Sequence, residues 1–439
     1  MEDTDNRLRK SISLNKLVCS ESSRHTKVLV TMDMDLYKKA IKLERLNAIY
    51  SEKWMLCPGG FHIVICALRC LGRTIEHSGL DEAWARTLYS SITVTQIING
   101  KHYNQAIQAH EITLEVLFNL WISAFFKETP AVYEALVNVL NELIVSCRNK
   151  MNVNIAHQKV LKVIEEINLE KQLHDFDKTH NDFPLYKWAR MYMRQVMSLL
   201  NFLSSIKDPD IYMYLASLEN LCKYFFSYNR LDYALNITEY LARVNNTRTT
   251  DPNMWNLLKA GGFALKSNSI PFAGIAVDQG QEFLNKILKG DGGLRGITNR
   301  PAALLQFCLT ASELARLALE TEELIGVNPT PKQKQHHHLS SAKFIQRQNN
   351  VEVLFDTLEP CNIFESTSPQ LYNVITKQVV TKEIEKDILN IETRGEKDMK
   401  SFVKDCICGS ENLWAPMKKL EYFNWNNTCK KNERLKWCH

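Results

Sequence analysis

The sequence predicts a predominantly α-helical protein that also contains an incomplete α/β core, made of a few short strands and interrupted by a large all-α insertion. Short runs of β-branched and apolar residues occur near residues 27–57 and 263–277. Between about residues 80 and 260, apolar side chains instead recur every three or four positions, which is the spacing of amphipathic helices. The 439 residues, 45% of them hydrophobic, suffice to bury a core.

The α/β part is expected to begin after residues 1–26, a polar stretch without apolar pattern that we predict to be disordered. A β-branched run then indicates a strand that ends at Asp33, and a second strand is broken by Pro58-Gly59-Gly60. The pattern predicts strand, helix, strand and helix, in that order, at residues 27–33, 36–46, 54–57 and 61–72.

Three apolar stripes indicate packed helices in the insertion, because each repeats at intervals of three and four residues. The stripes are Leu136, Leu140, Leu143, Ile144 and Cys147; Trp188, Tyr192, Val196, Leu199 and Leu203; and Ile211, Leu215, Leu218, Cys222 and Phe225. No fixed period relates them to one another, so a helical-repeat solenoid is not predicted.

After Gly261-Gly262 the strand pattern returns. Residues 263–266 and 271–277 predict a hairpin whose second strand leads into a helix beginning at Asp278. A spacing of four residues places Asp278 and Glu282 on one side of that helix. Further helices are expected at about 301–310, 312–324, 339–357, 379–392 and 396–407.

These patterns divide the chain into seven segments. They are a disordered N-terminus (1–26), the first part of the α/β core (27–79), the all-α insertion (80–260), a hairpin plus helices that complete the core (261–327), a linker (328–345), a small helical region (346–414) and a basic, aromatic tail (415–439).

The acids that follow the strands suggest metal chemistry. An RNase H-like site holds two divalent cations between carboxylates from strand ends and one helix, and the cations stabilise the attacking and leaving oxygens of a phosphoryl transfer. Asp33 ends a predicted strand and Glu282 lies on the helix after the hairpin. Acids are also common at such positions for dipole and solubility reasons, so spacing alone favours the site only weakly.

Two stretches add a resemblance to a known family. Val30 through Ala40, followed by Cys57-Pro-Gly-Gly-Phe-His62, is similar to the second catalytic aspartate and the downstream Cys/His motif of Mutator-like and related DDE transposases. Over nearly its whole length the chain also resembles an uncharacterised family of mobile-element proteins that is abundant in animal genomes. The matching segments are 58–62, 78–80, 221–226, 229–234, 269–272, 277–282 and 301–316.

The resemblance implies a nuclear, Mg²⁺-dependent DNA transposase in which Asp33 is the second metal-binding acid and Glu282 the last. Asp35 and Asp278 are the alternatives to them. His62 would orient a carboxylate or a DNA phosphate, or would be an ordinary histidine at a helix start. An RNase H core draws its first aspartate from a leading three-stranded unit, whereas only about 26 polar residues precede this strand. We therefore expect a truncated copy that is inactive alone.

The C-terminal tail is the candidate for DNA binding, because basic side chains alternate there with aromatic ones that could stack on bases. The candidate contacts are Lys418, Lys419, Trp425, Lys430, Lys431, Arg434 and Lys436. The tail's aromatic residues could equally dock on the helices. Zinc is not expected, because the C-terminal cysteines lack paired ligand spacing; they are Cys406, Cys408, Cys429 and Cys438.

Composition and apolar patterning limit the remaining classes. Twelve scattered cysteines indicate reduced thiols, and the N-terminus lacks a secretory signal. The longest apolar runs, 61–71 and 114–126, are too short to span a membrane. We expect a nuclear or cytoplasmic protein that is not secreted and has no membrane partner, while a homo-oligomer stays open. The alternative function is a non-catalytic helical interaction or DNA-binding protein, in which the acids are ordinary surface charges.

Overall fold

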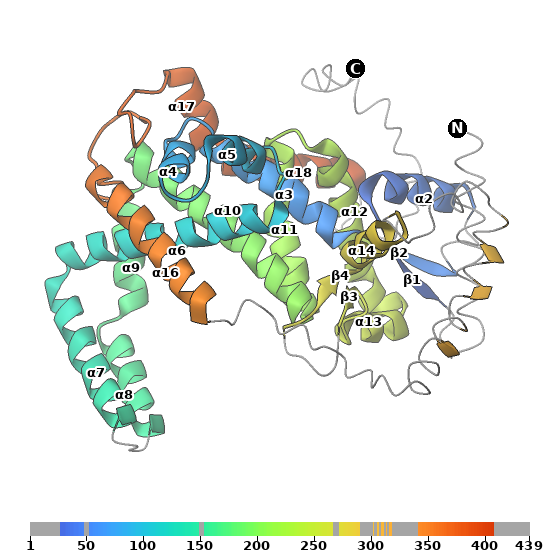
Figure 1. Ribbon diagram of the computed structural model, residues 1–439, viewed down its shortest axis with the longest axis horizontal. Helices are drawn as coiled ribbons and strands as arrows, with labels where there is room; N and C mark the ends of the chain where they lie inside the picture. Colours follow the sequence, from blue (N-terminus) through green and yellow to red (C-terminus); the bar gives the residue numbers. More distant parts are fainter. Residues whose placement is uncertain are drawn as a thin grey trace. The chain divides into compact units, whose positions relative to one another are not determined.

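The computed structural model describes residues 27–47, 52–148, 153–266, 272–289 and 341–407, together with single helical positions between 302 and 317. These residues are predominantly helical and include two pairs of short strands (Figure 1), which confirms the predicted predominance of helix. The N-terminal segment 1–26, most of the predicted linker and the tail 415–439 lie outside the described residues. No described helix is both long enough and apolar enough to cross a membrane.

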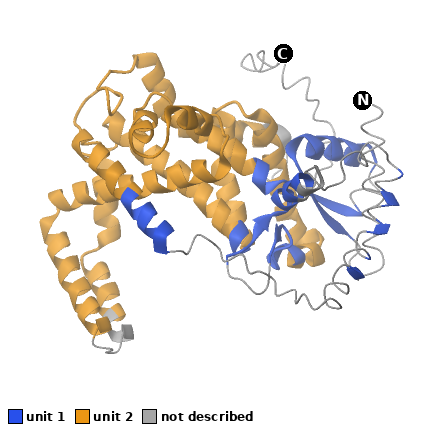
Figure 2. Cartoon of the chain, in the orientation of Figure 1, with its two compact units in different colours: residues 1–62, 206–209, 257–349 blue, residues 63–205, 210–256, 350–439 orange. Residues whose placement is uncertain are grey.

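The chain divides into two compact units, each assembled from segments that are far apart in sequence (Figure 2). Unit 1 consists of residues 1–62, 206–209 and 257–349. Unit 2 consists of residues 63–205, 210–256 and 350–439. Both cores therefore depend on contacts between distant parts of the chain.

The first half of unit 1 is a strand-helix-strand element. Strands β1 (Val28–Met32) and β2 (Trp54–Pro58) are parallel, with Val28 opposite Trp54 and Met32 opposite Pro58. Helix α2 (Met34–Leu46) connects them and packs on both. It begins two residues earlier than predicted because Asp33 is its N-cap, accepting a 2.8 Å hydrogen bond from the Leu36 amide.

The second half of unit 1 is a hairpin followed by a helix. Strands β3 (Ala264–Leu265) and β4 (Ile275–Ala276) are antiparallel, and both are shorter than the sequence pattern predicts. Helix α14 (Val277–Lys289) follows β4 directly and contacts both β3 and β1. The end of β1 and the start of α14 are thereby held in one small core.

Unit 2 is helical. It contains most of α3 (Gly60–Ile75), α4 (Leu80–Thr87), α5 (Ser91–Ile98), α6 (Tyr103–Glu128), α7 (Pro130–Arg148), α8 (Val153–Glu166), α9 (Leu169–His180), nearly all of α10 (Pro184–Lys207), α11 (Ile211–Ser227), α12 (Leu231–Thr250), the start of α13 (Pro252–Lys259), the end of α16 (Ser341–Leu358), the short 3₁₀ helix η3 (Glu359–Cys361), α17 (Lys382–Leu389) and α18 (Ile391–Ile407). Large buried aromatic residues fill its core, among them Trp84, Trp188 and Phe225.

Two of the three predicted apolar stripes lie in this core. All residues of the stripes that begin at Trp188 and Ile211 are buried. The predicted stripe on α7 is not buried as a whole, because Leu140 and Ile144 are 44% and 48% exposed. The buried residues of α7 are instead Val132 and Val139, and α7 packs on α8.

The C-terminal helices differ from prediction at one point. A break was expected at residues 393–395, whereas α17 ends at Leu389 and α18 runs without interruption from Ile391. Gly395 lies where α18 packs on α11, and a Cβ atom there would collide with the main-chain carbonyl of Lys223. This glycine therefore allows close helix packing and does not end the helix.

An ion cluster also joins α18 to the rest of unit 2. The Glu392 carboxylate accepts hydrogen bonds from Arg194 of α10 at 2.5 Å and from the Tyr224 hydroxyl of α11 at 2.7 Å, and Lys223 lies 3.3 Å away. Burial alone would raise the pKa of Glu392, but these donors and charges hold it below its ordinary value. The sequence analysis did not single out this residue, because its partners are more than 160 positions away.

Candidate functional site

One of the predicted acidic residues, Asp278, pairs directly with His62 in unit 1. His62 lies in the first turn of α3, just after β2, and its Nδ1 atom is 2.9 Å from Oδ2 of Asp278. The hydrogen bond to Asp278 raises the pKa of His62, burial opposes that shift, and the negative charges of Asp278, Asp33 and Glu282 add to it. The structure therefore pairs His62 with Asp278 from a distant part of the sequence, with Asp33 and Glu282 near enough to act on its charge.

Asp278 is the most tightly held of these acids. Its side chain is 4% exposed, and its two oxygens accept hydrogen bonds from the amides of Phe61 at 3.0 Å and His62 at 3.1 Å. These amides belong to the first turn of α3, where main-chain donors have no partner within the helix. Asp278 thus caps a helix more than 200 residues away in sequence and places a negative charge at its positive end.

Gly59 makes this cap possible. It immediately precedes α3, at the position where a capping side chain usually lies. A Cβ atom at Gly59 would collide with the carboxylate of Asp278. The glycine pair that the sequence indicates as a strand breaker therefore also provides space for a distant carboxylate.

Asp33, Glu282 and Asp35 differ in their surroundings. Asp33 is half-buried and caps α2, whereas Glu282 is exposed one turn after Asp278 on α14. Asp35 is 73% exposed and forms ion pairs with Lys38 at 3.5 Å and Lys39 at 3.4 Å. Asp35, one of the two alternatives, is thus a surface charge, while Asp278 occupies the buried position.

Several oxygens of these acids already accept hydrogen bonds. A two-metal centre needs several carboxylate oxygens directed at the cations. Both oxygens of Asp278 already accept main-chain hydrogen bonds, and Asp33 uses one oxygen to cap α2. Within the described parts of the chain, no group of three or more His, Cys, Asp or Glu side chains could hold a metal ion. The arrangement performs helix capping and charge pairing.

The remaining predicted site residues lie outside the described residues or away from this cluster. The DNA-contact candidates from Lys418 to Lys436 are outside, as are Cys408, Cys429 and Cys438. Cys406 lies in α18. Cys57 of the Cys/His motif is a buried residue of β2.

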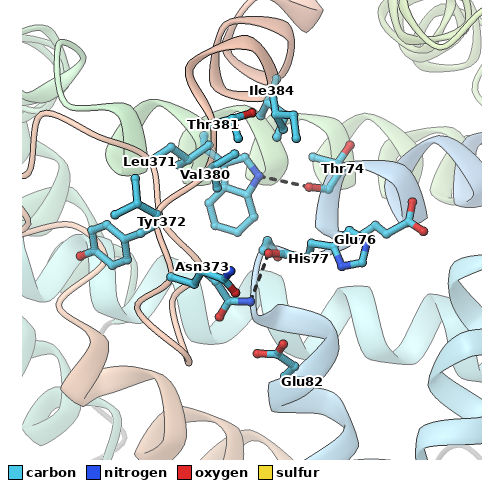
Figure 3. Close-up of a pocket in the computed structure, with 15 residues that line it drawn as sticks. Thr74, Glu76, His77, Glu82, Leu371, Tyr372, Asn373, Val380, Thr381 and Ile384 are labelled. Atoms are coloured by element: carbon cyan, nitrogen blue, oxygen red, sulfur yellow. Dashed lines mark hydrogen bonds between the residues drawn. The ribbon is translucent and has the colours of Figure 1, made fainter.

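A cavity of about 360 Å³ in unit 2 is a second candidate, which the sequence analysis did not identify (Figure 3). The indole of Trp188 donates a 3.1 Å hydrogen bond to the Thr74 carbonyl, and Asn373 donates one of 3.1 Å to the carbonyl of His77. The lining residues are Thr74, Glu76, His77, Ser78, Glu82, Trp188, Leu371, Tyr372, Asn373, Gln378, Val379, Val380, Thr381, Ile384 and Ile388.

The composition of this cavity favours a neutral or cationic ligand. Among the lining residues are the carboxylates of Glu76 and Glu82 and no lysine or arginine. One oxygen of Glu82 is buried without a hydrogen-bond partner in the described part of the chain. The volume lies at the lower end of the range for small-molecule sites. No sequence signal could have revealed the cavity, because its lining comes from three separate segments.

Comparison with known proteins gives a family and no described activity. No curated protein and no solved structure matches the chain. The match to a family model extends from residue 9 to residue 413 and thus includes every residue of the His62 cluster and the lining of the cavity. The chain therefore belongs to the family described as a domain of unknown function, DUF8702.

Proposed function

We propose that this protein derives from the RNase H-like DDE transposase of a mobile element and that it does not cut or join DNA by itself. The observation that carries the proposal is the 2.9 Å contact between Asp278 and His62, in a core where α14, which carries Asp278 and Glu282, packs on the strand that Asp33 follows. One of these acids follows a parallel strand, and two lie on the helix after a hairpin. Those are the positions that supply carboxylates in a two-metal phosphoryl-transfer core.

The order of elements in unit 1 supports this origin. Two parallel strands are joined by a helix, and an antiparallel hairpin later leads directly into α14. The two parts of unit 1 are separated by residues 63–256, which are helical and belong mainly to unit 2. An α/β core interrupted by an all-α insertion is the arrangement that the resemblance implies.

The hydrogen bonds of Asp278 support the absence of catalysis. Asp278 accepts two amides of α3 and pairs with a histidine, so three of its roughly four lone-pair sites are occupied and only Oδ1 retains one. Two-metal catalysis depends on carboxylates already in place around the reacting phosphate. The cluster that resembles a catalytic centre therefore has a structural task in this chain.

A nicking assay tests the proposal. Purified full-length protein, incubated with supercoiled DNA and Mg²⁺ or Mn²⁺, should give neither nicking nor strand transfer. The Asp33→Asn and Asp35→Asn variants serve as a matched pair, because both remove an acid from the start of α2 and only Asp33 belongs to the cluster. DNA cleavage that Asp33→Asn abolishes and Asp35→Asn retains would overturn the claim of inactivity.

The origin has its own test in the surrounding genomic DNA. Terminal inverted repeats on both sides of the coding sequence would support a mobile-element source. Copies of the gene at a single conserved chromosomal position in related species, without such repeats, would contradict it.

A second candidate function is DNA binding by residues 415–439. The composition of this segment carries the proposal, because six basic residues alternate with aromatic ones over 25 positions. A band-shift assay should show binding that weakens with salt, with a slope of log affinity against log salt no steeper than about −5 for six phosphate contacts. Deleting 415–439 should abolish the shift and deleting 1–26 should not; a shift that survives the tail deletion would contradict this.

A further inference from the structure

Helices α7 and α8 form a hairpin whose apolar surface is only partly covered. The two helices pack side by side and extend away from the other helices of unit 2 (Figure 1). Glu142 and Lys159 form a 3.2 Å ion pair across the hairpin. The buried residues of α7 and α8 are Val132, Val139 and Val160. Two helices alone bury little apolar surface, so the hairpin needs a further partner to cover the remainder.

The uncovered surface is a regular stripe on α7. We call the five residues Tyr133, Val137, Leu140, Ile144 and Cys147 the outer stripe. They are separated by alternating steps of four and three residues, which is the repeat of a coiled-coil seam. Tyr133, Leu140 and Ile144 are 44–49% exposed, Cys147 is exposed and Val137 is half-buried. Apolar residues exposed at the spacing of a coiled-coil seam are a candidate surface for another helix.

The outer stripe is complementary to itself in the antiparallel direction. If two copies of α7 cross with Leu140 facing Leu140 of the other copy, Tyr133 faces Cys147, and Val137 faces Ile144. Every position of the stripe then meets another apolar residue. Such reciprocity is what a two-fold symmetric interface requires, because each residue must also be the partner of its own partner.

The charges beside the stripe agree with this register. Glu134 follows the first residue of the stripe and Arg148 follows the last, and both side chains are exposed. In the antiparallel pair, Glu134 of one copy lies opposite Arg148 of the other, twice by symmetry. In a parallel pair, the two side chains lie on opposite flanks of the seam and cannot form this pair. The flanking charges therefore favour the antiparallel pair over the parallel one.

The surface area that two outer stripes would bury together is adequate for a reversible contact. At close to half exposure, the outer stripe presents roughly 350–400 Å² of apolar surface per copy, and the flanking polar residues bring the pair to about 1,000 Å². That total is the lower limit for a specific interface and corresponds to a weak complex. We propose that the outer stripe of α7 binds the same stripe of a second copy of this protein, antiparallel and centred on Leu140, to form a four-helix contact between two α7–α8 hairpins.

Sedimentation of the full-length protein tests the association. A monomer–dimer equilibrium is expected at micromolar concentrations, and Leu140→Asp should shift it at least tenfold toward monomer. Ile92→Asp is the matched control, because Ile92 of α5 is 73% exposed and lies outside the hairpin. A wild-type protein that stays monomeric at the highest concentration measured, or a Leu140→Asp protein that dimerises as well as the control, would overturn the proposal.

Oxidative cross-linking tests the register in a Cys147→Ser background. Leu140→Cys should form a disulfide-linked dimer readily, because the two introduced thiols meet at the symmetry axis. Asn138→Cys should not, because residue 138 is exposed on a different side of α7. Equal cross-linking at the two positions would contradict the seam.

Charge reversal tests the antiparallel direction. Glu134→Arg and Arg148→Glu should each weaken the dimer several-fold, and the double variant should restore it. Failure of the double variant to recover would contradict this pairing, even if a dimer exists.

Discussion

Removing the carboxylate of Asp278 is the sharpest test of the buried cluster. The substitution Asp278→Ala leaves the amides of Phe61 and His62 without an acceptor in a site where the replaced side chain is 4% exposed. Each hydrogen bond to a charged acceptor contributes about 1.5–3 kcal/mol, and breaking a buried ion pair by removing one partner costs about 3–5 kcal/mol. Since these terms overlap, we expect a loss of about 3–5 kcal/mol in the free energy of unfolding.

Two related substitutions set the scale of that loss. Asp278→Asn retains one acceptor oxygen and should cost about 1–2 kcal/mol. Asp35→Asn removes an acid that is 73% exposed and should change the free energy of unfolding by less than about 0.5 kcal/mol. Urea unfolding measures these differences, and hydrogen exchange of the segment 54–66 shows whether the start of α3 opens. An Asp278→Ala protein with the midpoint and exchange rates of Asp35→Asn would refute the capping role.

Three further predictions concern pH and packing. Folding raises the pKa of His62 from its ordinary value of 6.5, so the stabilisation by protonated His62 is complete below pH 6.5 and is lost as pH rises through the folded pKa. In urea unfolding, the difference in stability between wild type and His62→Gln should therefore be larger at about pH 5.5 than at about pH 8.5. The lowered pKa of Glu392 acts in the opposite sense, since its stabilisation is present above pH 4.5 and is lost as pH falls through the folded pKa. Glu392→Gln should lower the free energy of unfolding by about 1–3 kcal/mol at pH 7 and make unfolding less sensitive to acid. An acid transition that this substitution leaves unchanged would argue against the Glu392 ion cluster. Gly395→Ala should lower the free energy of unfolding by about 1–3 kcal/mol, because the added Cβ collides with Lys223. This loss should exceed the gain of about 1 kcal/mol from the higher helix propensity of alanine. A raised melting temperature would disprove the close contact.

Local signals explain which parts of unit 1 could be predicted from the sequence. The β-branched run that ends at Asp33 and the Pro58-Gly59-Gly60 break act within a few residues, and strand, helix, strand and helix occur near the expected positions. The helix after the hairpin begins at Val277, one residue before the predicted start. Signals of this kind act between neighbouring residues, so they can be recognised in the sequence alone.

The role of Asp278 could not be predicted, because its partners lie 216 and 217 positions away. Spacing placed Asp278 and Glu282 on one side of a helix and left Asp278 as the alternative to Glu282. In the structure the two residues have different tasks, since Asp278 is buried against α3 and Glu282 is exposed. Only the fold decides which acid meets a helix terminus.

Apolar periodicity in α7 illustrates a second limit of sequence reasoning. A repeat of three and four residues shows that a helix has an apolar face, but it does not show which residues of a wide face a neighbour covers. Val139 is buried and Leu140 beside it is 44% exposed. The sequence pattern is similar for both residues, and the packing of α7 in the folded protein makes the difference.

The distance in sequence between Asp278 and the start of α3 also has a consequence during synthesis. A ribosome adds roughly 5–20 residues per second, so the 216 residues between His62 and Asp278 take roughly 10–40 s to make. Throughout that interval the first turn of α3 has no acceptor from α14, while the helices of unit 2 are already emerging. The core of unit 1 is therefore completed only when the hairpin and α14 arrive, and a nascent chain arrested before residue 278 should carry α3 with a frayed beginning.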